Sequence, residues 1–211
     1  MATLADMKSR IADELARNDL AAPIASAIAD AIGAYQTERF FFNESRDLCT
    51  FNTVVGQQFY GASDHALIPD ILAIDYVAIT VGSIVSLMSA ARPAALEDLG
   101  NAGTQRGEPY AYAWYDRKLR LYPPPGQVYP VRIAGHFRLG APASDLEAGN
   151  VWMVEAERLI RSRAKYELAI HWLKDGELAT TMAASVTEAL DQLKARTNRQ
   201  TATGIVQPTR F

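Results

Sequence analysis

Three histidines, one cysteine and scattered carboxylates are the side chains of this chain that could hold a metal ion or act in acid–base chemistry. His65, His136 and His171 lie far apart, and none has the spacing of a zinc-binding His-Glu-x-x-His helix. Cys49 is alone, so no zinc knuckle can form around it. His171 falls near the end of a predicted helix, where a histidine commonly contacts the last carbonyls. We therefore expect no metal site and no metal-dependent activity.

The motifs of nucleophilic catalysis and of phosphate binding are also missing from the sequence. Ser83 follows a glycine but lacks the Gly-x-Ser-x-Gly elbow of serine hydrolases, because Val81 and Val85 occupy the two glycine positions. Three glycines have spacings of three and four but do not follow a predicted strand or open a helix, as dinucleotide binding requires. They are Gly100, Gly103 and Gly107. A flexible loop explains them better.

Four carboxylates are spread along the sequence, and their spacing alone does not identify a catalytic pair. They are Asp70, Asp75, Glu97 and Asp98. With no nucleophile, base or metal set to accompany them, the sequence predicts a protein that is not an enzyme and that binds no cofactor.

Composition and charge limit the remaining classes of protein to which the chain could belong. A chain of 211 residues with 49% hydrophobic and 21% charged content can bury a core, and its formal charge of -3 gives no general argument for nucleic-acid binding. A single cysteine cannot form an internal disulfide, which favours a reducing compartment. No apolar run reaches the roughly 18 residues that span a bilayer, and the amino terminus lacks a signal-peptide pattern. We expect a soluble protein that is not exported by the general pathway and has no membrane partner.

One local basic cluster stands out in the carboxy-terminal half. It contains Arg158, Arg161, Arg163 and Lys165. Glu155, Glu157 and Glu167 lie among these cations, so ion pairs along a helix could use them, on a solvated or a subunit-contact face. The alternative is a face that lines a channel for DNA. We keep both hypotheses for these four residues.

The elements that would position these side chains begin with two short helices. Apolar residues recur at helical spacing from Leu4 to Leu15, and Asn18-Asp19 interrupts the pattern. Pro23 suits the first turn of a second helix, whose apolar residues run from Ile24 to Tyr35. The tight connection predicts an antiparallel pair.

A run of three phenylalanines, Phe40, Phe41 and Phe42, follows the second helix. Three adjacent side chains cannot all lie on one face of a helix, so at least one ring should point away from the helix seam into a second layer. The run is interpreted as core at a junction between helices and a sheet.

Between residues 47 and 140, short apolar runs alternate with glycine, proline and aspartate, which predicts strands. The expected strands are residues 48–55, 57–60, 74–81, 84–88, 110–115, 118–122 and 128–137. Gly82-Ser83 and Asp116-Arg117 are expected hairpin turns, and consecutive hairpins favour an antiparallel meander. Residues 92–101 are expected to form a short helix between strands.

Residues 141–149 form a polar loop that leads to Asn150, a good helix cap. One long amphipathic helix should follow, with a buried stripe and an end at Asp175-Gly176. The stripe comprises Trp152, Leu159, Tyr166, Ile170 and Leu173. A last helix has apolar residues from Leu178 to Leu193 at spacings of four and three, and residues 197–211 are expected to form an extended tail.

These elements predict an α+β fold. Residues 1–46 and 141–196 would form a helical bundle from two terminal helix pairs, and residues 47–140 would be an inserted, antiparallel β-rich region. Residues 197–211 would be the carboxy-terminal tail.

Several ordered segments resemble the head-to-tail adaptor, or connector, proteins of tailed bacteriophages. A helix ends in Phe42-Asn43-Glu44, and a Thr-Phe-x-Thr-Val-x-Gly-Gln-x-x-Tyr stretch begins at Thr50. Ile68-Pro69, Ile74-Asp75, the segments 107–110 and 119–124 and the closing helix pair complete the likeness, which covers most of the chain.

The resemblance implies a structural virion protein, made in the cytoplasm of the bacterial host. Such adaptors form a ring under the portal, usually a dodecamer, that extends the DNA channel and lets genomic DNA pass without reading its sequence. The implied partners are the portal protein, a tail, tail-terminator or nozzle protein, and copies of the chain itself. The resemblance places the portal contact in the tail, at Gly204, Ile205, Val206, Gln207, Pro208, Thr209, Arg210 and Phe211.

The aromatic strand supports a hypothesis from another class. Tyr110, Tyr112 and Trp114 share one face by the two-residue period of a strand, opposite Ala111 and Ala113. They could pack on another layer, or they could form the site of a small-ligand or carbohydrate-binding module. Such a module would remain monomeric and would respond to a sugar.

Overall fold

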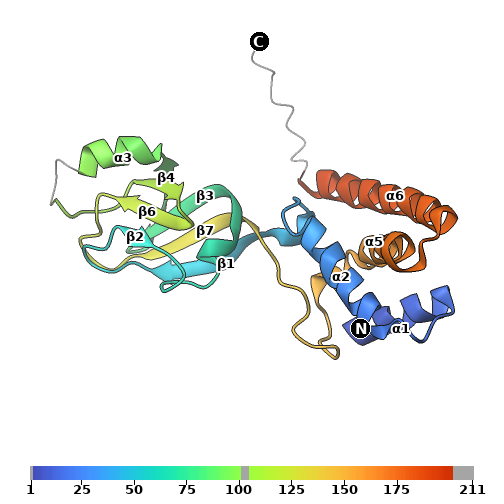
Figure 1. Ribbon diagram of the computed structural model, residues 1–211. Helices are drawn as coiled ribbons and strands as arrows, with labels where there is room; N and C mark the ends of the chain where they lie inside the picture. The colour runs from blue at the N-terminus through green and yellow to red at the C-terminus, as the bar shows by residue number, and fades with distance from the viewer. Residues whose placement is uncertain (1, 101–104, 202–211) are drawn as a thin grey trace, which may run out of the picture. The chain divides into compact units, whose positions relative to one another are not determined.

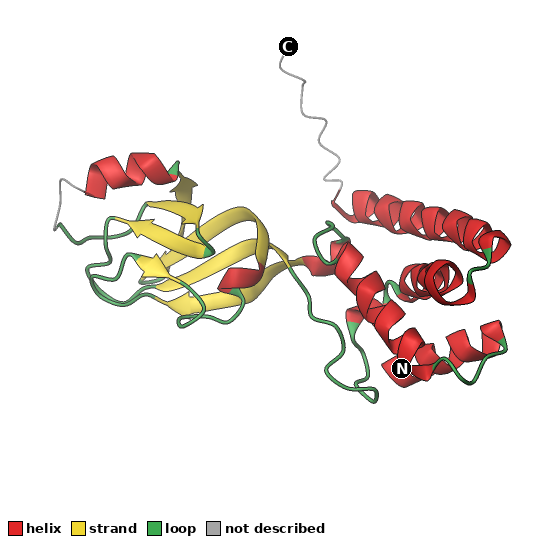
Figure 2. Cartoon of the chain, in the orientation of Figure 1, coloured by secondary structure: helices red, strands yellow, loops and turns green. Residues whose placement is uncertain are grey.

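The computed structural model describes residues 2–100 and 105–201 and confirms an α+β fold (Figures 1 and 2). The chain divides into two compact units. One comprises Met1–Phe42 and Leu139–Phe211, and the other comprises Asn43–Arg138. The first unit is helical, and the second contains all seven strands of the described part of the chain.

The helical unit is built from both ends of the chain. Its elements are α1 (Leu4–Leu15), α2 (Ala21–Tyr35), α4 (Val151–Val154), α5 (Glu157–Leu168), the π-helical η3 (Ala169–Leu173) and α6 (Gly176–Thr201). A capping box opens α1, in which the Asp6 amide donates to Thr3 Oγ1 (3.1 Å) and the Thr3 amide donates to Asp6 Oδ2 (2.9 Å). The predicted first helix pair is therefore present. Its buried residues Ile11, Ile24, Ile28 and Ile32 follow the predicted spacing.

The predicted long helix after Asn150 is interrupted. Asn150 does cap it, because its side chain accepts a hydrogen bond from the Trp152 amide (3.1 Å). However, α4 ends at Val154, and α5 starts only at Glu157. Beyond α5 the helix widens into the π-helical η3, which changes the residues that face the core. Ile170, which we expected in the buried stripe, is exposed as a result.

The last helix is longer than predicted. Residues 197–201 were expected to belong to an extended tail, but α6 continues through Thr201. Thr197 is buried, and its hydroxyl donates to the Leu193 carbonyl (2.9 Å), so the helix retains a core contact beyond its last leucine. The rest of the predicted tail lies outside the described residues.

The three phenylalanines all pack within the helical unit, so the prediction that one ring points into a second layer is wrong. Phe40 is fully buried, and Phe41 and Phe42 pack on the same core. The Phe40 and Phe42 rings stack with centroids 5.1 Å apart, and Phe42 meets Trp152 edge to face at 5.3 Å. The chain leaves the helix after Tyr35, so the three side chains are not bound to helical spacing and can converge.

The second unit contains a sheet (Figure 1). The sheet has seven strands in the order β1-β7-β3-β4-β5-β6-β2. The strands are β1 (Glu44–Asn52), β2 (Phe59–Tyr60), β3 (Ile71–Val81), β4 (Ile84–Ala90), β5 (Ala111–Tyr115), β6 (Lys118–Tyr122) and β7 (Pro130–Phe137). The short helices η1 (Phe41–Asn43) and η2 (Ile68–Asp70) precede β1 and β3, and α3 (Pro93–Gly100) lies between β4 and β5. Every predicted strand overlaps an observed one. Both predicted hairpin turns are present, because Val81 pairs with Ile84 and Tyr115 pairs with Lys118.

The sheet is mixed, so the expectation of an antiparallel meander is wrong. β5 runs parallel to β4, because the chain crosses from one strand to the other through α3. β7, the last strand in sequence, lies between β1 and β3 and is antiparallel to both.

The inner side of the sheet holds one apolar core that includes Val77, Ile79, Leu121 and Ile133. Cys49 is part of it, and burial raises the pKa of its thiol to about 11. β3 and β7 follow an irregular register beside Gly135, where a Cβ would overlap the carbonyl oxygen of Ala73. This close backbone approach requires glycine.

Candidate interaction surfaces

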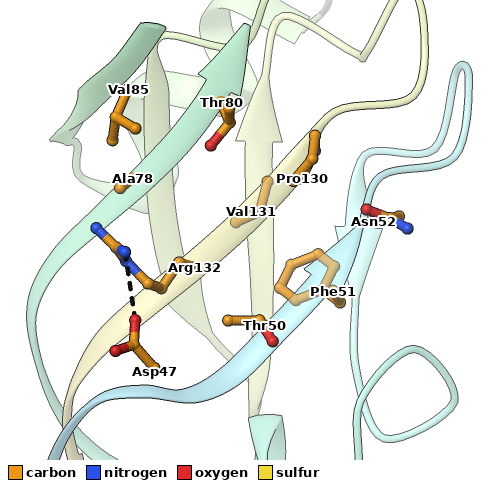
Figure 3. Close-up of a pocket in the computed structure, with 10 residues that line it drawn as sticks. All are labelled: Asp47, Thr50, Phe51, Asn52, Ala78, Thr80, Val85, Pro130, Val131 and Arg132. Atoms are coloured by element: carbon orange, nitrogen blue, oxygen red, sulfur yellow. Dashed lines mark hydrogen bonds and ion pairs between the residues drawn. The ribbon is translucent and has the colours of Figure 1, made fainter. Parts of the chain in front are cut away.

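A groove lies on the outer face of the sheet, across β1, β7, β3 and β4 (Figure 3). Its volume is about 370 Å³. The residues that line it are Asp47, Thr50, Phe51, Asn52, Ala78, Thr80, Val85, Pro130, Val131 and Arg132. They come from four strands whose order was not predictable, so sequence reasoning missed the groove. The sequence did indicate, through the two-residue period of each strand, which side chains share a face of that strand.

The groove is suited to contact rather than to catalysis. Its two ionisable side chains form an ion pair, in which Arg132 Nη1 lies 3.2 Å from Asp47 Oδ1 (Figure 3). The other polar side chains that line it are two threonines and an asparagine. Asp47 and Arg132 are therefore engaged with each other at the wall of the groove.

The hairpin of β3 and β4 presents large apolar side chains to solvent. Leu87 is 68% exposed, Ile84 66% and Val85 54%. Val85 and Leu87 follow the two-residue period and therefore share the outer face with the groove. Single exposed apolar residues are common on protein surfaces, but a cluster of them on one short strand marks a contact surface.

The basic cluster of the helical unit is paired with carboxylates of the same unit. Arg158 donates to Glu188 of α6 (2.8 Å), and Arg163 reaches Glu167 (2.5 Å). Arg161 and Lys165 both bind Glu14 of α1, the lysine at 2.6 Å. Each of the four cations therefore has a carboxylate partner. The cluster joins α1, α5 and α6.

Glu14 is the centre of this ion-pair network. Its partial burial acts to raise the pKa of its carboxyl group. The hydrogen bond from Lys165 and the charges of Lys165 and Arg161 outweigh that effect, so the pKa lies below its ordinary value of 4.5. Glu14 is consequently a carboxylate at neutral pH.

The three histidines lie at separate places within the described residues. His65 Nδ1 lies 3.6 Å from Cys49 Sγ and accepts a hydrogen bond from the Leu67 amide (3.3 Å). His136 is buried in β7, with Glu44 3.6 Å from one ring nitrogen and Asp75 3.7 Å from the other. His171 is exposed beside Glu167 (3.3 Å). Among residues 2–100 and 105–201, no group of three histidine, cysteine or acidic side chains is placed to hold a metal ion.

The aromatic strand does not form an open stacking surface. Tyr112 is buried in the sheet core, and Trp114 packs against the same core. Tyr110 is exposed, but it precedes β5 and contacts Tyr122 edge to face at 5.8 Å. Ala111 and Ala113 pack under Leu96 of α3. The packing alternative therefore accounts for Tyr112 and Trp114, and the geometry gives the carbohydrate-binding hypothesis no support.

A smaller hollow of about 240 Å³ surrounds Arg120 in β6. The guanidinium is buried, lies 2.5 Å from Glu97 of α3 and sits over the Phe59 ring at 5.2 Å. Asp70 lies 3.8 Å from Arg117, so the predicted carboxylates Asp70 and Glu97 have separate ion-pair partners. Arg120 joins α3 to the sheet, which sequence reasoning did not foresee.

The predicted portal-contact residues, 204–211, lie outside the described part of the chain. Within the described part, no helix has the length and apolar character needed to cross a bilayer.

Comparison with protein families gives a match over nearly the whole chain. The model of the SU10 adaptor protein family matches residues 2–208. None of the curated proteins matches the chain.

Proposed function

The chain belongs to the SU10 adaptor protein family, and we propose from this membership that it is a head-to-tail adaptor of a tailed phage. In this proposal, copies of the chain form a ring, a dodecamer, under the capsid portal. The ring joins the portal to the tail and extends the channel through which genomic DNA passes. The family match over residues 2–208 is the observation that carries the proposal.

The two units of the chain support a structural role. Each has its own apolar core. The exposed apolar side chains of β4 offer a surface to another protein rather than to a small molecule. An adaptor of this kind performs no chemistry, and its work consists of holding partners together.

Charge supports the passage of DNA without readout. The formal charge of the chain is -3, and the four cations of the basic cluster are paired with carboxylates of α1, α5 and α6. In the proposed ring, the net negative charge of each chain and the pairing of this cluster would weaken attraction to the phosphate backbone, so DNA could pass. Of the four, Arg158 is the most exposed, and it is our candidate for a contact with a neighbouring copy or with the channel.

The partners in this proposal are the portal protein, a tail, tail-terminator or nozzle protein, and further copies of the chain. The protein would be made in the host cytoplasm and would function in the virion, at the head–tail interface.

We assign the portal contact to residues 204–211 from the sequence alone. Ile205, Val206 and Phe211 are apolar anchors in an otherwise polar segment. A segment of this composition has too few apolar groups to offset the cost of ordering, roughly 1–2 kcal/mol per residue, unless a partner supplies surface. A groove on the portal would supply it, and repetition around a ring would strengthen a weak single contact.

Deletion of residues 204–211 tests this assignment. We expect the truncated chain to keep its thermal midpoint but to lose co-purification with the portal of the same phage. A full-length variant with Ile205, Val206 and Phe211 replaced by Ala should behave in the same way. The matched control replaces Thr203 and Thr209 by Ala and should still co-purify. Undiminished occupancy of the portal by the truncated chain would show that the anchor lies elsewhere.

A further inference from the structure

Two stretches of the sheet lack a strand partner on one side among the described residues. In the order β1-β7-β3-β4-β5-β6-β2, β1 lies at one end and pairs only with β7. β4 is an interior strand that pairs with β3 through residues Ile84 to Met88. β5 pairs with β4 only at Ser89 and Ala90. Among the described residues, no strand occupies the second side of Val85–Leu87 or of Thr50–Asn52.

Hydrogen-bond alternation identifies the free groups of β4. In a two-residue hairpin, the residues that flank the turn exchange hydrogen bonds, so Ile84, Ser86 and Met88 point toward β3. Val85 and Leu87 therefore point away from β3. Ser89 continues this series, and its amide donates to the Tyr110 carbonyl (2.8 Å). Val85 and Leu87 precede the stretch of β4 that pairs with the start of β5, and they keep the same direction without a strand partner among the described residues.

The same alternation applies to β1. The Thr53 amide donates to the Tyr129 carbonyl of the segment that leads into β7 (2.8 Å), so Thr53, Phe51 and Cys49 face that strand. Thr50 and Asn52 then direct their amide and carbonyl groups outward. Their side chains line the groove, as does that of Val85 (Figure 3). The free residues of both edges thus carry their side chains on one face of the sheet.

We propose that β4 of one copy pairs with β1 of a second copy, so that the sheet continues from chain to chain. Successive strands from β1 to β4 are antiparallel, so β4 runs opposite to β1. If a second copy has the groove-bearing face of its sheet on the same side, its β1 lies beside β4 of the first copy and runs antiparallel to it. Leu87 then lies opposite Thr50 of the second copy, and Val85 lies opposite Asn52. The irregular segment between Ser45 and Cys49 excludes a register shifted further toward Glu44.

This contact joins two different edges, so it repeats head to tail. A repeated head-to-tail contact closes into a ring when its rotation allows, whereas a contact between two identical edges ends at a dimer. The inference rests on the proposed function for the ring itself and adds the surface through which neighbours meet. It also accounts for the exposed Val85 and Leu87, because natural edge strands usually avoid a flat apolar surface.

Cysteine cross-linking tests the register. Thr50→Cys and Leu87→Cys are introduced together, and the protein is mildly oxidised and separated without reductant. Paired residues at this type of position lie about 5.5 Å apart, within reach of a disulfide. We expect a ladder of dimers, trimers and larger species from the double variant. A mixture of the two single variants should stop at dimers, and each single variant alone should stay monomeric. Cys49 is buried and remains in every variant as background.

Three outcomes would overturn the proposal. A double variant without cross-links excludes this register, and dimers from Leu87→Cys alone indicate pairing of two β4 edges. The third outcome comes from a charge placed on the free side of β4. The background for this test is the Val85→Cys, Asn52→Cys double variant. In it, Leu87→Lys should abolish the ladder of cross-linked species, whereas Ile84→Lys should keep it, because Ile84 is equally exposed but its backbone groups face β3. Equal ladders from both variants would show that the edge is not used.

Failure of this contact and failure of the adaptor role give different results. If rings form on portals while the cysteine pair stays reduced, the adaptor role stands and the sheet-edge contact is wrong. If the pair cross-links in the free protein but no ring forms on a portal, the contact stands and the adaptor role is wrong.

Discussion

Phe40 is one of the large, fully buried side chains of the helical unit. It stacks on Phe42 and meets Trp152 edge to face at 6.4 Å. Replacement by Ala should lower the free energy of unfolding by about 3–5 kcal/mol, because the cavity that remains cannot be refilled by its rigid aromatic neighbours. Urea unfolding followed by far-ultraviolet circular dichroism measures this loss of stability.

Trp172→Ala is the matched control, since Trp172 belongs to the same unit but is exposed. It should change the free energy of unfolding by less than about 1 kcal/mol. Equal losses from Phe40→Ala and Trp172→Ala would contradict the packing described for Phe40.

Glu14 gives a pH-dependent prediction. Its pKa is lowered in the folded chain by Lys165 and Arg161 against the effect of burial, so as pH falls the unfolded chain takes up the proton first. The network therefore stabilises the fold above the ordinary pKa of 4.5, and this stabilisation is lost as pH falls through the folded pKa. Glu14→Gln should cost about 1 kcal/mol or less at pH 7, because the carboxylate is partly screened by water.

The difference between wild type and Glu14→Gln should shrink as pH falls below the ordinary pKa of 4.5, as measured by urea unfolding at several pH values. Asp191→Asn is the control, because Asp191 is exposed on α6 and forms no ion pair with a described residue. A Glu14→Gln deficit that stays constant with pH would show that the effect is steric.

Among the elements, β7 requires a glycine, Gly135, for its close approach to β3. Gly135 lies where β7 meets the irregular part of β3, and a Cβ there would overlap the Ala73 carbonyl oxygen. Gly135→Ala should therefore destabilise the sheet by about 3 kcal/mol or more, measured by thermal or urea unfolding. Gly61→Ala is the control in the same unit, because its Cβ would meet only the flexible Lys118 side chain at 3.4 Å. Similar stabilities of the two variants would contradict the close approach at Gly135.

Local sequence patterns predicted the elements well and their arrangement less well. The hairpin at Gly82-Ser83 follows from two residues with strong turn preference between β-branched strands. The parallel pairing of β4 with β5 was missed, although the helix predicted between them is the usual connection of parallel strands. The position of β7 between β1 and β3 depends on pairing between residues distant in sequence, which local patterns do not contain.

Helix ends were also difficult to predict. The break at Glu155-Ala156 has no proline or glycine to indicate it, although Ala156 is buried in the helical core. The end of α6 was also predicted too early. The sequence after Leu193 is polar, but the helix continues through Thr201, and Thr197 within this stretch is buried.

For the whole molecule, the candidate surfaces could be predicted only in part. The basic cluster was visible in the sequence, but the carboxylate that binds Arg161 and Lys165 lies on α1, at the opposite end of the chain. The groove joins residues of four strands, so its composition depends on the sheet order. The family could be recognised because its likeness follows the order of segments along the chain and does not require their arrangement in space.

We propose that copies of this chain form a ring on a portal. Single-particle electron microscopy of the full-length protein, mixed with the portal of the same phage, tests it most directly. We predict an added ring of density on one face of the portal, coaxial with the channel and built from copies of this chain. Portals that carry no added density at saturating concentrations of the protein would contradict the account.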